Sequence, residues 1–522
     1  MTMGRQKSDG REVPEGRRKA APTGESRGGK AVTVNEQTGQ LALFGETAES
    51  PQGARARVGV DPSTRKSTRV PKSPSGKGRS LSPITMEVVA DEQNLKVAFA
   101  KVASNRGAPG PDGQSIQTVR KHLDAHVKRL SRSLLDGSYK VGDIRRVWIP
   151  KKSGGQRGLG IPNVMDRIVQ QATYQILSPH YEPDFHEWSH GFRPGRSCHT
   201  AIKKAKEHLE AGMEWVVDID LSKFFDEVGH DRLMSRLERK ISDGRVLKLI
   251  RQMLRARVVM PDGVVIENSK GTPQGGPLSP LLSNIVLDEL DQELARRGHR
   301  FVRYADDCNV YVKTERSGQR VMASLTDFIE RKMKLKVNRD KSAVDRPRNR
   351  KFLGLTLMRL KSGQVRVLVS KQSLRTLRER LKEMSPRNWG ASLDACMAQL
   401  NRFMRGWLGY FGVCDPKQIP TLGREDAHLR RRLRAIQLKQ WKKKRLILPH
   451  LIRLGSPPAV ARVDIYCRRR SWWAMSKCRG VTRALTNAHF AERGLMSLAV
   501  DWRREHERIW KIGPEQQMLP VG

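Results

Sequence analysis

The sequence predicts a mixed α+β fold over residues 84–369, followed by an all-α part. In the first region, short segments with the apolar alternation of strands are interspersed with stretches that have helical spacing. Beyond residue 369 only helical spacing remains, with Leu374, Leu377 and Leu381 on one stripe. Residues 1–83 contain 16 basic and 8 acidic residues and one aromatic residue. Such a segment buries too little apolar surface to offset the entropy of ordering, so we expect a disordered basic arm.

The mixed region begins with a helix expected at 94–104 and a turn-rich run after it. Strand-like segments at 147–150 and 159–162 flank a glycine-rich turn and predict a β-hairpin. A helical stretch at 165–177 follows.

Two acidic segments lie further along the mixed region. In WVVDIDLSKFFDEV (215–228), Asp218 and Asp220 share one face of a predicted strand, and a helix is expected to begin at the two phenylalanines. In FVRYADDCNVYV (301–312), Asp306 and Asp307 lie at the tip of a predicted hairpin. Carboxylates from a strand end and a nearby hairpin tip suit hard divalent cations, which suggests a two-metal phosphoryl-transfer site. In the alternative reading, Asp218 or Asp226 caps the helix or solubilises a strand end, and we expect this for one of the two.

Three other residues fit a nucleotide substrate. Lys151 and Arg157 lie six positions apart across a glycine-rich turn, so both cations could reach a triphosphate from one side. The run 271–280 is rich in glycine and proline, which predicts an irregular loop that presents Gln274 and lets a substrate approach closely.

The all-α part contains the most basic segment, residues 424–445, with ten basic and two acidic residues. Apolar residues recur in it at helical spacing, so we expect one basic amphipathic helix that contacts RNA phosphates rather than only solvent. The expected RNA-binding residues are Arg430, Arg431, Arg432, Arg434, Lys439, Lys442, Lys443, Lys444 and Arg445. From about residue 449 the sequence predicts a small helical module.

Composition restricts the class of partner and the compartment. The net charge is +45, which indicates a polyanionic partner, most simply nucleic acid. Six cysteines without a CxxC pair argue against a disulfide framework and a zinc ribbon, and fit a reducing cytoplasm. No stretch approaches the apolar length of a signal peptide or membrane span, so we expect a cytoplasmic protein that does not bind membranes.

Seven ordered blocks resemble those of reverse transcriptases encoded by bacterial group II introns. They are IPKKSGGQRGLGIP, HGFRPGRSCHTAI, DIDLSKFFDEV, GTPQGGPLSPLLSNI, YADD, LKVNRDKS and KFLGL. Upstream, NLKVAFAKVASNRGAPGPDG resembles the N-terminal extension of that family, and NRFMRGWLGYFG with the basic segment resembles its maturase region. The resemblance runs from about residue 84 to the mid-400s and is weaker beyond.

The resemblance implies a right-hand polymerase with fingers and palm, an all-α thumb or maturase domain, and a small C-terminal helical module. Its implied activity is RNA-directed DNA synthesis together with help in splicing the intron RNA, followed by target-primed insertion into DNA. By position, Asp220, Asp306 and Asp307 would hold two magnesium ions, and Asp218 competes with Asp220 for the first place. Lys151, Arg157 and Gln274 match positions that contact the deoxynucleoside triphosphate, and Phe225 matches the bulky residue beside the ribose 2′-hydroxyl.

The implied division is a basic arm (1–83), fingers and palm (84–369), thumb or maturase domain (370–448) and a DNA-binding tail (449–522). The expected partners are intron RNA and target DNA, and no protein partner can be inferred. The paired CxxC motifs of a His-Asn-His nuclease, which many members carry, are missing here. We therefore expect no second-strand cleavage and a primer from elsewhere, and we expect Cys467 and Cys478 to be buried or free thiols. The alternatives are a non-catalytic RNA-binding splicing factor and a reverse transcriptase of a retron or diversity-generating system.

Overall fold

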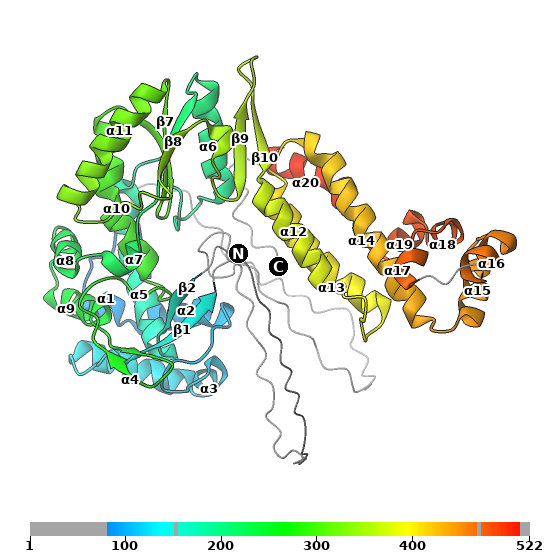
Figure 1. Ribbon diagram of the computed structural model, residues 1–522. Coiled ribbons are helices and arrows are strands. Elements are labelled where there is room, and N and C mark those ends of the chain that lie inside the picture. The colour runs from blue at the N-terminus through cyan, green and yellow to red at the C-terminus, as the bar shows by residue number, and fades with distance from the viewer. Residues whose placement is uncertain (1–80, 151–154, 467–470, 512–522) are drawn as a thin grey trace, which may run out of the picture.

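A computed structural model describes residues 81–150, 155–466 and 471–511 (Figure 1). Two β-sheets with their helices occupy one side of the molecule, and the helical part extends from them on the other side (Figure 1). The expected order of a mixed α+β region followed by helices is confirmed.

The first sheet has the strand order β2-β1-β4-β5. The predicted hairpin is confirmed: β1 and β2 pair antiparallel, with Arg145 opposite Ile161 and Pro150 opposite Gln156. The expected helices are found as α2 and α5, each slightly longer than predicted. The elements of this region are α1 (Met86–Val89), α2 (Glu92–Ser104), α3 (Ile116–Lys121), α4 (Leu123–Leu135), β1 (Ile144–Pro150), β2 (Gln156–Ile161), α5 (Val164–Tyr181), β4 (Val258–Val259) and β5 (Val265–Ile266).

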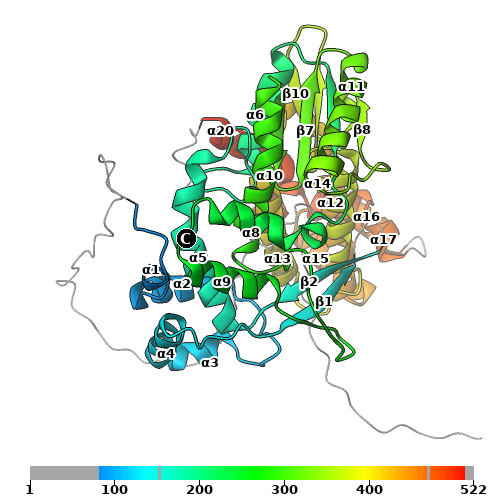
Figure 2. The same ribbon diagram turned by 90° about the vertical axis from the view of Figure 1, so that its left-hand side faces the viewer.

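The second sheet, the palm, has the order β6-β7-β3-β8, and all its pairs are antiparallel. Alternate side chains of its strands enter two different cores. Phe301 and Val310 pack into the core that includes α10, whereas Val302 and Tyr311 pack into the core that includes α6. The sheet therefore lies between helices on both faces, as Figure 2 also shows. Its elements are α6 (Cys198–Glu210), β3 (Trp215–Ile219), α10 (Ser279–Arg296), β6 (Arg300–Tyr304), β7 (Asp307–Val312), α11 (Glu315–Asp327) and β8 (Ala343–Asp345).

Short elements connect these layers. The helix predicted at the two phenylalanines is found as α7, a single turn. The connecting elements are η1 (Glu182–Asp184), α7 (Phe224–Glu227), α8 (His230–Glu238), α9 (Gly244–Leu254), the π-helical turn η2 (Phe328–Lys332) and η3 (Pro347–Asn349).

A two-stranded hairpin of β9 (Leu355–Arg359) and β10 (Val365–Val369) leads from the palm into the helical part. Three long helices follow, α12 (Lys371–Glu383), α13 (Leu393–Phe411) and α14 (Ile419–Gln440), with the short turn η4 (Pro416–Gln418) before α14. Side chains from the hairpin, from these helices and from α6 share one core, which anchors the helical part on the palm.

The C-terminal region is a cluster of short helices and one longer helix that returns to the palm side. The short helices are α15 (Lys444–Arg453), α16 (Pro458–Tyr466), α17 (Trp472–Met475), α18 (Arg479–Ala484) and α19 (Asn487–Glu492). The last helix, α20 (Leu498–Lys511), packs on α13 and α14. Asp426 of α14 accepts hydrogen bonds from the backbone N–H groups of Leu498 and Ala499, both 3.0 Å, and so caps the start of α20. The helices expected beyond residue 449 are therefore present, and both the short helices and α20 contribute side chains to the same core as α12–α14.

The basic segment 424–445 differs from the prediction of one continuous helix. α14 ends at Gln440 and α15 begins at Lys444, with a break between them. Lys442 has a φ of 60° at this break, a left-handed conformation that a helix interior does not allow. The physical reason for the misprediction is that neither proline nor glycine marks this break in the sequence.

Five cysteines, including Cys478, are described, and all five are buried. This agrees with the expectation for Cys478, whereas Cys467 lies outside the described residues. In the described part of the chain, no helix is both long and apolar enough to cross a membrane.

Candidate active site

The two adjacent aspartates lie at the tip of the β6–β7 hairpin, as the sequence predicts. Tyr304 is the last residue of β6 and pairs with Asp307, the first residue of β7, so that Ala305 and Asp306 form the turn. Ala305 has a φ of 57°, which an L-residue adopts only at some energetic cost. The backbone of this turn therefore has to be held in place by its surroundings.

The neighbouring strand β3 ends beside this turn. Ile219, its last residue, pairs with Cys308 of β7, so Asp220 follows at the end of the sheet where the turn lies. The backbone of Asp220 is fixed by three hydrogen bonds to two residues: its N–H donates to Ser342 Oγ (3.0 Å), and its carbonyl accepts from Asn338 N–H (2.8 Å) and from the Ser342 hydroxyl (3.4 Å). Asp220, Asp306 and Asp307 are thus brought together by the topology of the palm sheet.

The charges of the neighbouring carboxylates contribute to the pKa values of Asp306 and Asp307. Asp306 is half-buried and Asp307 is exposed, so both remain open to a ligand. Desolvation by the surrounding protein, followed by the charges of Asp306, Asp218 and Asp220, raises the pKa of Asp307 to about 7. Desolvation also raises the pKa of Asp306, while the charge of Arg157 opposes the rise. Uncompensated negative charge therefore accumulates at the turn.

Asp218 and Asp220 have different surroundings. The Asp218 carboxylate accepts two hydrogen bonds from Arg350, from Nε (2.9 Å) and from Nη2 (2.7 Å), and the pair is about three-quarters buried. Among the described residues, Asp220 pairs only with the more distant Lys341 ammonium, 3.7 Å away, and that lysine is largely exposed. Asp218 is therefore engaged in a structural ion pair, whereas Asp220 is available to a ligand. Asp226 lies exposed within α7, and the cap residue of that helix is Lys223.

Asp220, Asp306 and Asp307 offer a metal ion carboxylate oxygens as ligands. Among the residues that the structure describes, no group of three or more His, Cys, Asp or Glu side chains converges closely enough to hold a metal. The chemistry of the donors nevertheless fits, because carboxylate oxygens are the ligands that magnesium prefers. A divalent cation would also relieve the mutual repulsion that raises the pKa of Asp307.

Arg157 and Gln274, both expected at the nucleotide, are in direct contact. Arg157 Nε donates a 2.9 Å hydrogen bond to Gln274 Oε1. The Gln274 carbonyl accepts a 2.7 Å hydrogen bond from Gly160 N–H, so the loop before α10 lies on β2. Gly275 makes this approach possible, because its φ is 123° and a Cβ there would lie 2.3 Å from the Gly160 carbonyl oxygen. Lys151 lies outside the described residues.

Phe225 lies in α7, partly buried against Phe224 in an edge-to-face arrangement with ring centroids 5.3 Å apart. Its carbonyl accepts a 2.7 Å hydrogen bond from Thr272 N–H, in the same loop that carries Gln274. The loop thereby connects Phe225 with the Arg157–Gln274 pair.

Comparison with known proteins identifies the region that carries these residues. Residues 149–357 match the profile of the family described as reverse transcriptase (RNA-dependent DNA polymerase), and residues 374–451 match the group II intron, maturase-specific domain. Protein YkfC of Escherichia coli is 34% identical over 60% of this chain and 90% of its own length. The group II intron-encoded protein LtrA of Lactococcus lactis is 39% identical over 40% of this chain.

The chain belongs to the group II intron-encoded reverse transcriptases. As a member it is an RNA-directed DNA polymerase with a maturase domain, as the sequence analysis expected. The match covers 34% of the length of LtrA, about a third of that relative. Among solved structures, a partial Cas6-RT-Cas1–Cas2 complex matches with a TM-score of 0.31 and 22% identity over 47% of this chain and 42% of that chain, a likeness too distant to support an argument.

The maturase match includes the nine basic residues expected to bind RNA, and the structure divides them into two groups. Arg432 is buried and donates to the Ser385 carbonyl and hydroxyl at the end of α12. Arg434 Nε donates to the Leu485 carbonyl (2.8 Å), and Arg431 stacks on Trp473 with its guanidinium carbon 3.8 Å from the ring centroid. These three arginines therefore join α14 to its neighbours. Lys439, Lys442, Lys443 and Arg445 are exposed, and Arg430 and Lys444 are partly exposed.

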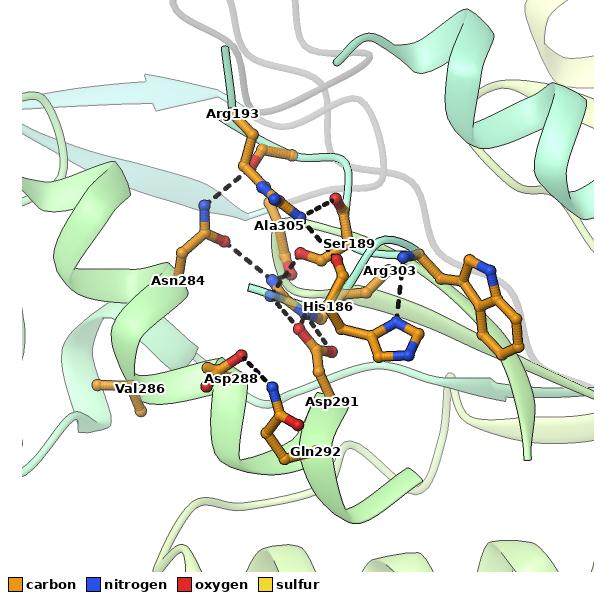
Figure 3. Close-up of polar contacts among 12 residues, drawn as sticks. His186, Ser189, Arg193, Asn284, Val286, Asp288, Asp291, Gln292, Arg303 and Ala305 are labelled. Carbon is orange, nitrogen blue, oxygen red and sulfur yellow. Dashed lines mark hydrogen bonds and ion pairs between the residues drawn. The ribbon is translucent and has the colours of Figure 1, made fainter. Parts of the chain in front are cut away.

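The residues behind the β6–β7 turn are not among those that the sequence predicts for the site. Arg303 lies next to the turn in β6 and is fully buried in a network with Asp291 and Asn284 of α10 (Figure 3). A signal was present in the sequence, because Arg303 is the one charge inside the apolar run 301–305. A charge in a buried strand requires partners.

Proposed function

We propose that Asp220, Asp306 and Asp307 form the polymerase active site with which this reverse transcriptase extends a DNA primer on an RNA template. The observation that carries the proposal is the shared location of the three carboxylates, at the end of β3 and on the adjoining β6–β7 turn. Desolvation, together with the charges of the neighbouring carboxylates, raises the pKa of Asp307.

These three aspartates would hold two magnesium ions, which supply charge stabilisation at the reacting phosphate when bound. The protein's own contributions come from the surrounding residues. Arg157 and Gln274, with Lys151, would bind the deoxynucleoside triphosphate, and the Arg157 charge would attract its phosphates. Phe225 would press on the sugar and disfavour a ribose 2′-hydroxyl. Asp218, already paired with Arg350, would support the strand rather than bind metal.

The nucleic-acid partners follow from the domains. The maturase domain implies binding of intron RNA. We infer that the exposed residues Lys439, Lys442, Lys443 and Arg445 contribute phosphate contacts, and that the full chain inserts its intron into target DNA by target-primed reverse transcription. The proposed division is fingers and palm to residue 369, the thumb or maturase domain at 370–448 and a DNA-binding tail after it. Action on these substrates would place the protein in the bacterial cytoplasm, with the nucleoid.

Primer extension tests the proposed site. The full chain is given an RNA template, a DNA primer, magnesium and deoxynucleotides, and is compared with Asp306→Asn and Asp220→Asn, which preserve side-chain size. We expect both variants to lose synthesis while their affinity for intron RNA remains, because phosphate contacts dominate that affinity. Asp226→Asn is the matched control, since that residue is an exposed aspartate of α7 outside the proposed site. Full synthesis by Asp306→Asn would contradict the proposal. Absence of synthesis by the unaltered chain, with tight RNA binding, would favour the splicing-factor alternative.

A further inference from the structure

A fully buried ion pair lies directly behind the catalytic turn. The side chains of Arg303 in β6 and Asp291 in α10 are both 0% exposed. Arg303 Nε donates to both carboxylate oxygens of Asp291 (2.8 and 3.0 Å), and Nη2 donates to Oδ2 (2.5 Å). The desolvation penalty of burying two charges offsets much of the attraction between them. A contribution to stability is therefore a poor explanation for the presence of this ion pair.

The remaining donors of Arg303 reach three further groups around the turn. Nη1 donates to Asn284 Oδ1 (3.0 Å) and to the Ala305 carbonyl (2.9 Å), and Nη2 donates to Ser189 Oγ (2.7 Å) (Figure 3). Each guanidinium nitrogen therefore has a partner, and one of the partners is the backbone of the residue before Asp306. A planar fork with fixed donor directions fixes the orientation of its acceptors.

The opposite side of the turn is closed by the segment around residue 190. A Cβ atom at Gly191 would lie 2.1 Å from Ala305 N, so this segment presses directly on the turn. The Gly191 carbonyl accepts a 2.9 Å hydrogen bond from Asn284 Nδ2, and Asn284 in turn accepts from Arg303. His190 N–H donates to the Arg303 carbonyl (2.8 Å), and Arg303 N–H donates to the Trp188 carbonyl (3.0 Å). Arg303 and Asn284 thus connect both sides of the turn.

We propose that Arg303, oriented by Asp291 and Asn284, is a positioning residue that fixes the left-handed Ala305 and thereby the direction of the Asp306 and Asp307 carboxylates. The unfavourable φ of Ala305 requires such support, and the guanidinium supplies it without contact to substrate. The inference rests on the proposed active site. It adds that the geometry of the catalytic carboxylates depends on a residue that the reaction itself does not touch.

The test compares Arg303→Met with Arg236→Met in the full chain. Arg236 is the matched control, because it also pairs with a carboxylate of α10, Glu289, and donates to the Val286 carbonyl (2.9 Å), but it has no bond to the turn. We expect Arg303→Met to lower kcat of primer extension by about 100-fold, the size of effect that a small misplacement of reacting groups produces. The KM for template and primer should change little. Arg236→Met should lower Tm less, because its ion pair is partly exposed, and should leave kcat near that of the unaltered chain.

Two further measurements separate positioning from general destabilisation. Hydrogen exchange of peptides covering 300–312 should speed up in Arg303→Met and not in Arg236→Met. Arg303→Lys keeps the positive charge but lacks the planar guanidinium with its fixed donor directions. Compared with Arg303→Met, it should therefore restore Tm more than kcat. A kcat loss in Arg303→Met no larger than in Arg236→Met would overturn the inference.

Milder variants cover the case in which Arg303→Met fails to fold. Ser189→Ala and Asn284→Ala each remove one acceptor of Arg303 and keep its ion pair with Asp291. Unchanged kcat and exchange in both variants would overturn the inference. Asp306→Asn is measured in parallel. If Asp306→Asn is inactive while the Arg303 variants are fully active, only the positioning role of Arg303 is contradicted. If Asp306→Asn is active, the proposed active site itself is contradicted.

Discussion

Arg157 of β2 and Gln274 of the loop before α10 share a 2.9 Å hydrogen bond although 117 positions separate them in the chain. The bond joins the hairpin of the first sheet to the loop that also contacts Phe225. In the proposed function, these residues meet on the path of the incoming nucleotide. The guanidinium is therefore oriented before the nucleotide arrives, which reduces the entropy lost on binding.

Removal of this pair should weaken nucleotide binding. We expect Gln274→Ala to raise the KM for deoxynucleotides by roughly tenfold, because it removes a charge-assisted hydrogen bond and releases Arg157. Steady-state primer extension by Gln274→Ala, Arg157→Ala and the double variant forms a double-mutant cycle. If the free-energy effects of the two single substitutions simply add in the double variant, the two side chains are not coupled.

Asp218 and Asp220 should respond oppositely to the same substitution. Asp218→Asn leaves the partly buried Arg350 without its carboxylate partner, so we expect a lower Tm and retained DNA synthesis. Asp220→Asn should abolish synthesis with little change in Tm. Thermal unfolding and primer extension on both variants check this. If Asp218→Asn were the inactive variant and Asp220→Asn the active one, the assignment of the first metal ligand would be reversed.

The raised pKa of Asp307 predicts a pH dependence of stability in metal-free buffer. The folded state binds the Asp307 proton up to about pH 7, whereas the unfolded chain releases it near the ordinary aspartate value of 3.8. The contribution of this group to stability is therefore fully present below that ordinary value and is lost as the pH rises to about 7. Asp307→Asn should become progressively more stable than the unaltered chain over this range. Tm measured against pH with a chelator tests this, and magnesium should reduce the difference.

The basic residues of 430–445 should separate into two classes. Replacement of Lys439, Lys442, Lys443 and Arg445 by Gln should weaken RNA binding and reduce its salt dependence, because fewer counterions are released on binding when phosphate contacts are lost. Arg432→Met should instead destabilise the fold by about 2 kcal/mol, since it leaves the Ser385 carbonyl without its buried partner. RNA binding at a series of salt concentrations and thermal unfolding distinguish the two classes. An unchanged salt slope in the fourfold variant would show that these side chains do not contact RNA.

Much of the site was predictable because its chemistry is local. Strand alternation and the aspartate pair predicted the β6–β7 hairpin, and helical spacing predicted α2, α5 and the thumb helices. The choice of Asp220 over Asp218 came from the family resemblance, and the Arg350 ion pair now supplies a physical reason that no local pattern contains. The break at residues 441–443 was missed, because a left-handed lysine leaves no mark in composition.

The sequence alone determined the class of the fold and predicted a nucleic-acid partner and residues suited to metal and phosphate, because hydrophobic periodicity, net charge and side-chain chemistry can be read from short segments. Only the tertiary structure decided which arginines of the basic segment contact other parts of the protein and which are exposed, and that Arg303 contacts the β6–β7 turn. The burial of Arg432 and the partners of Arg303 depend on residues far away in the chain. Such contacts arise when helices and strands pack together, and no local pattern contains them.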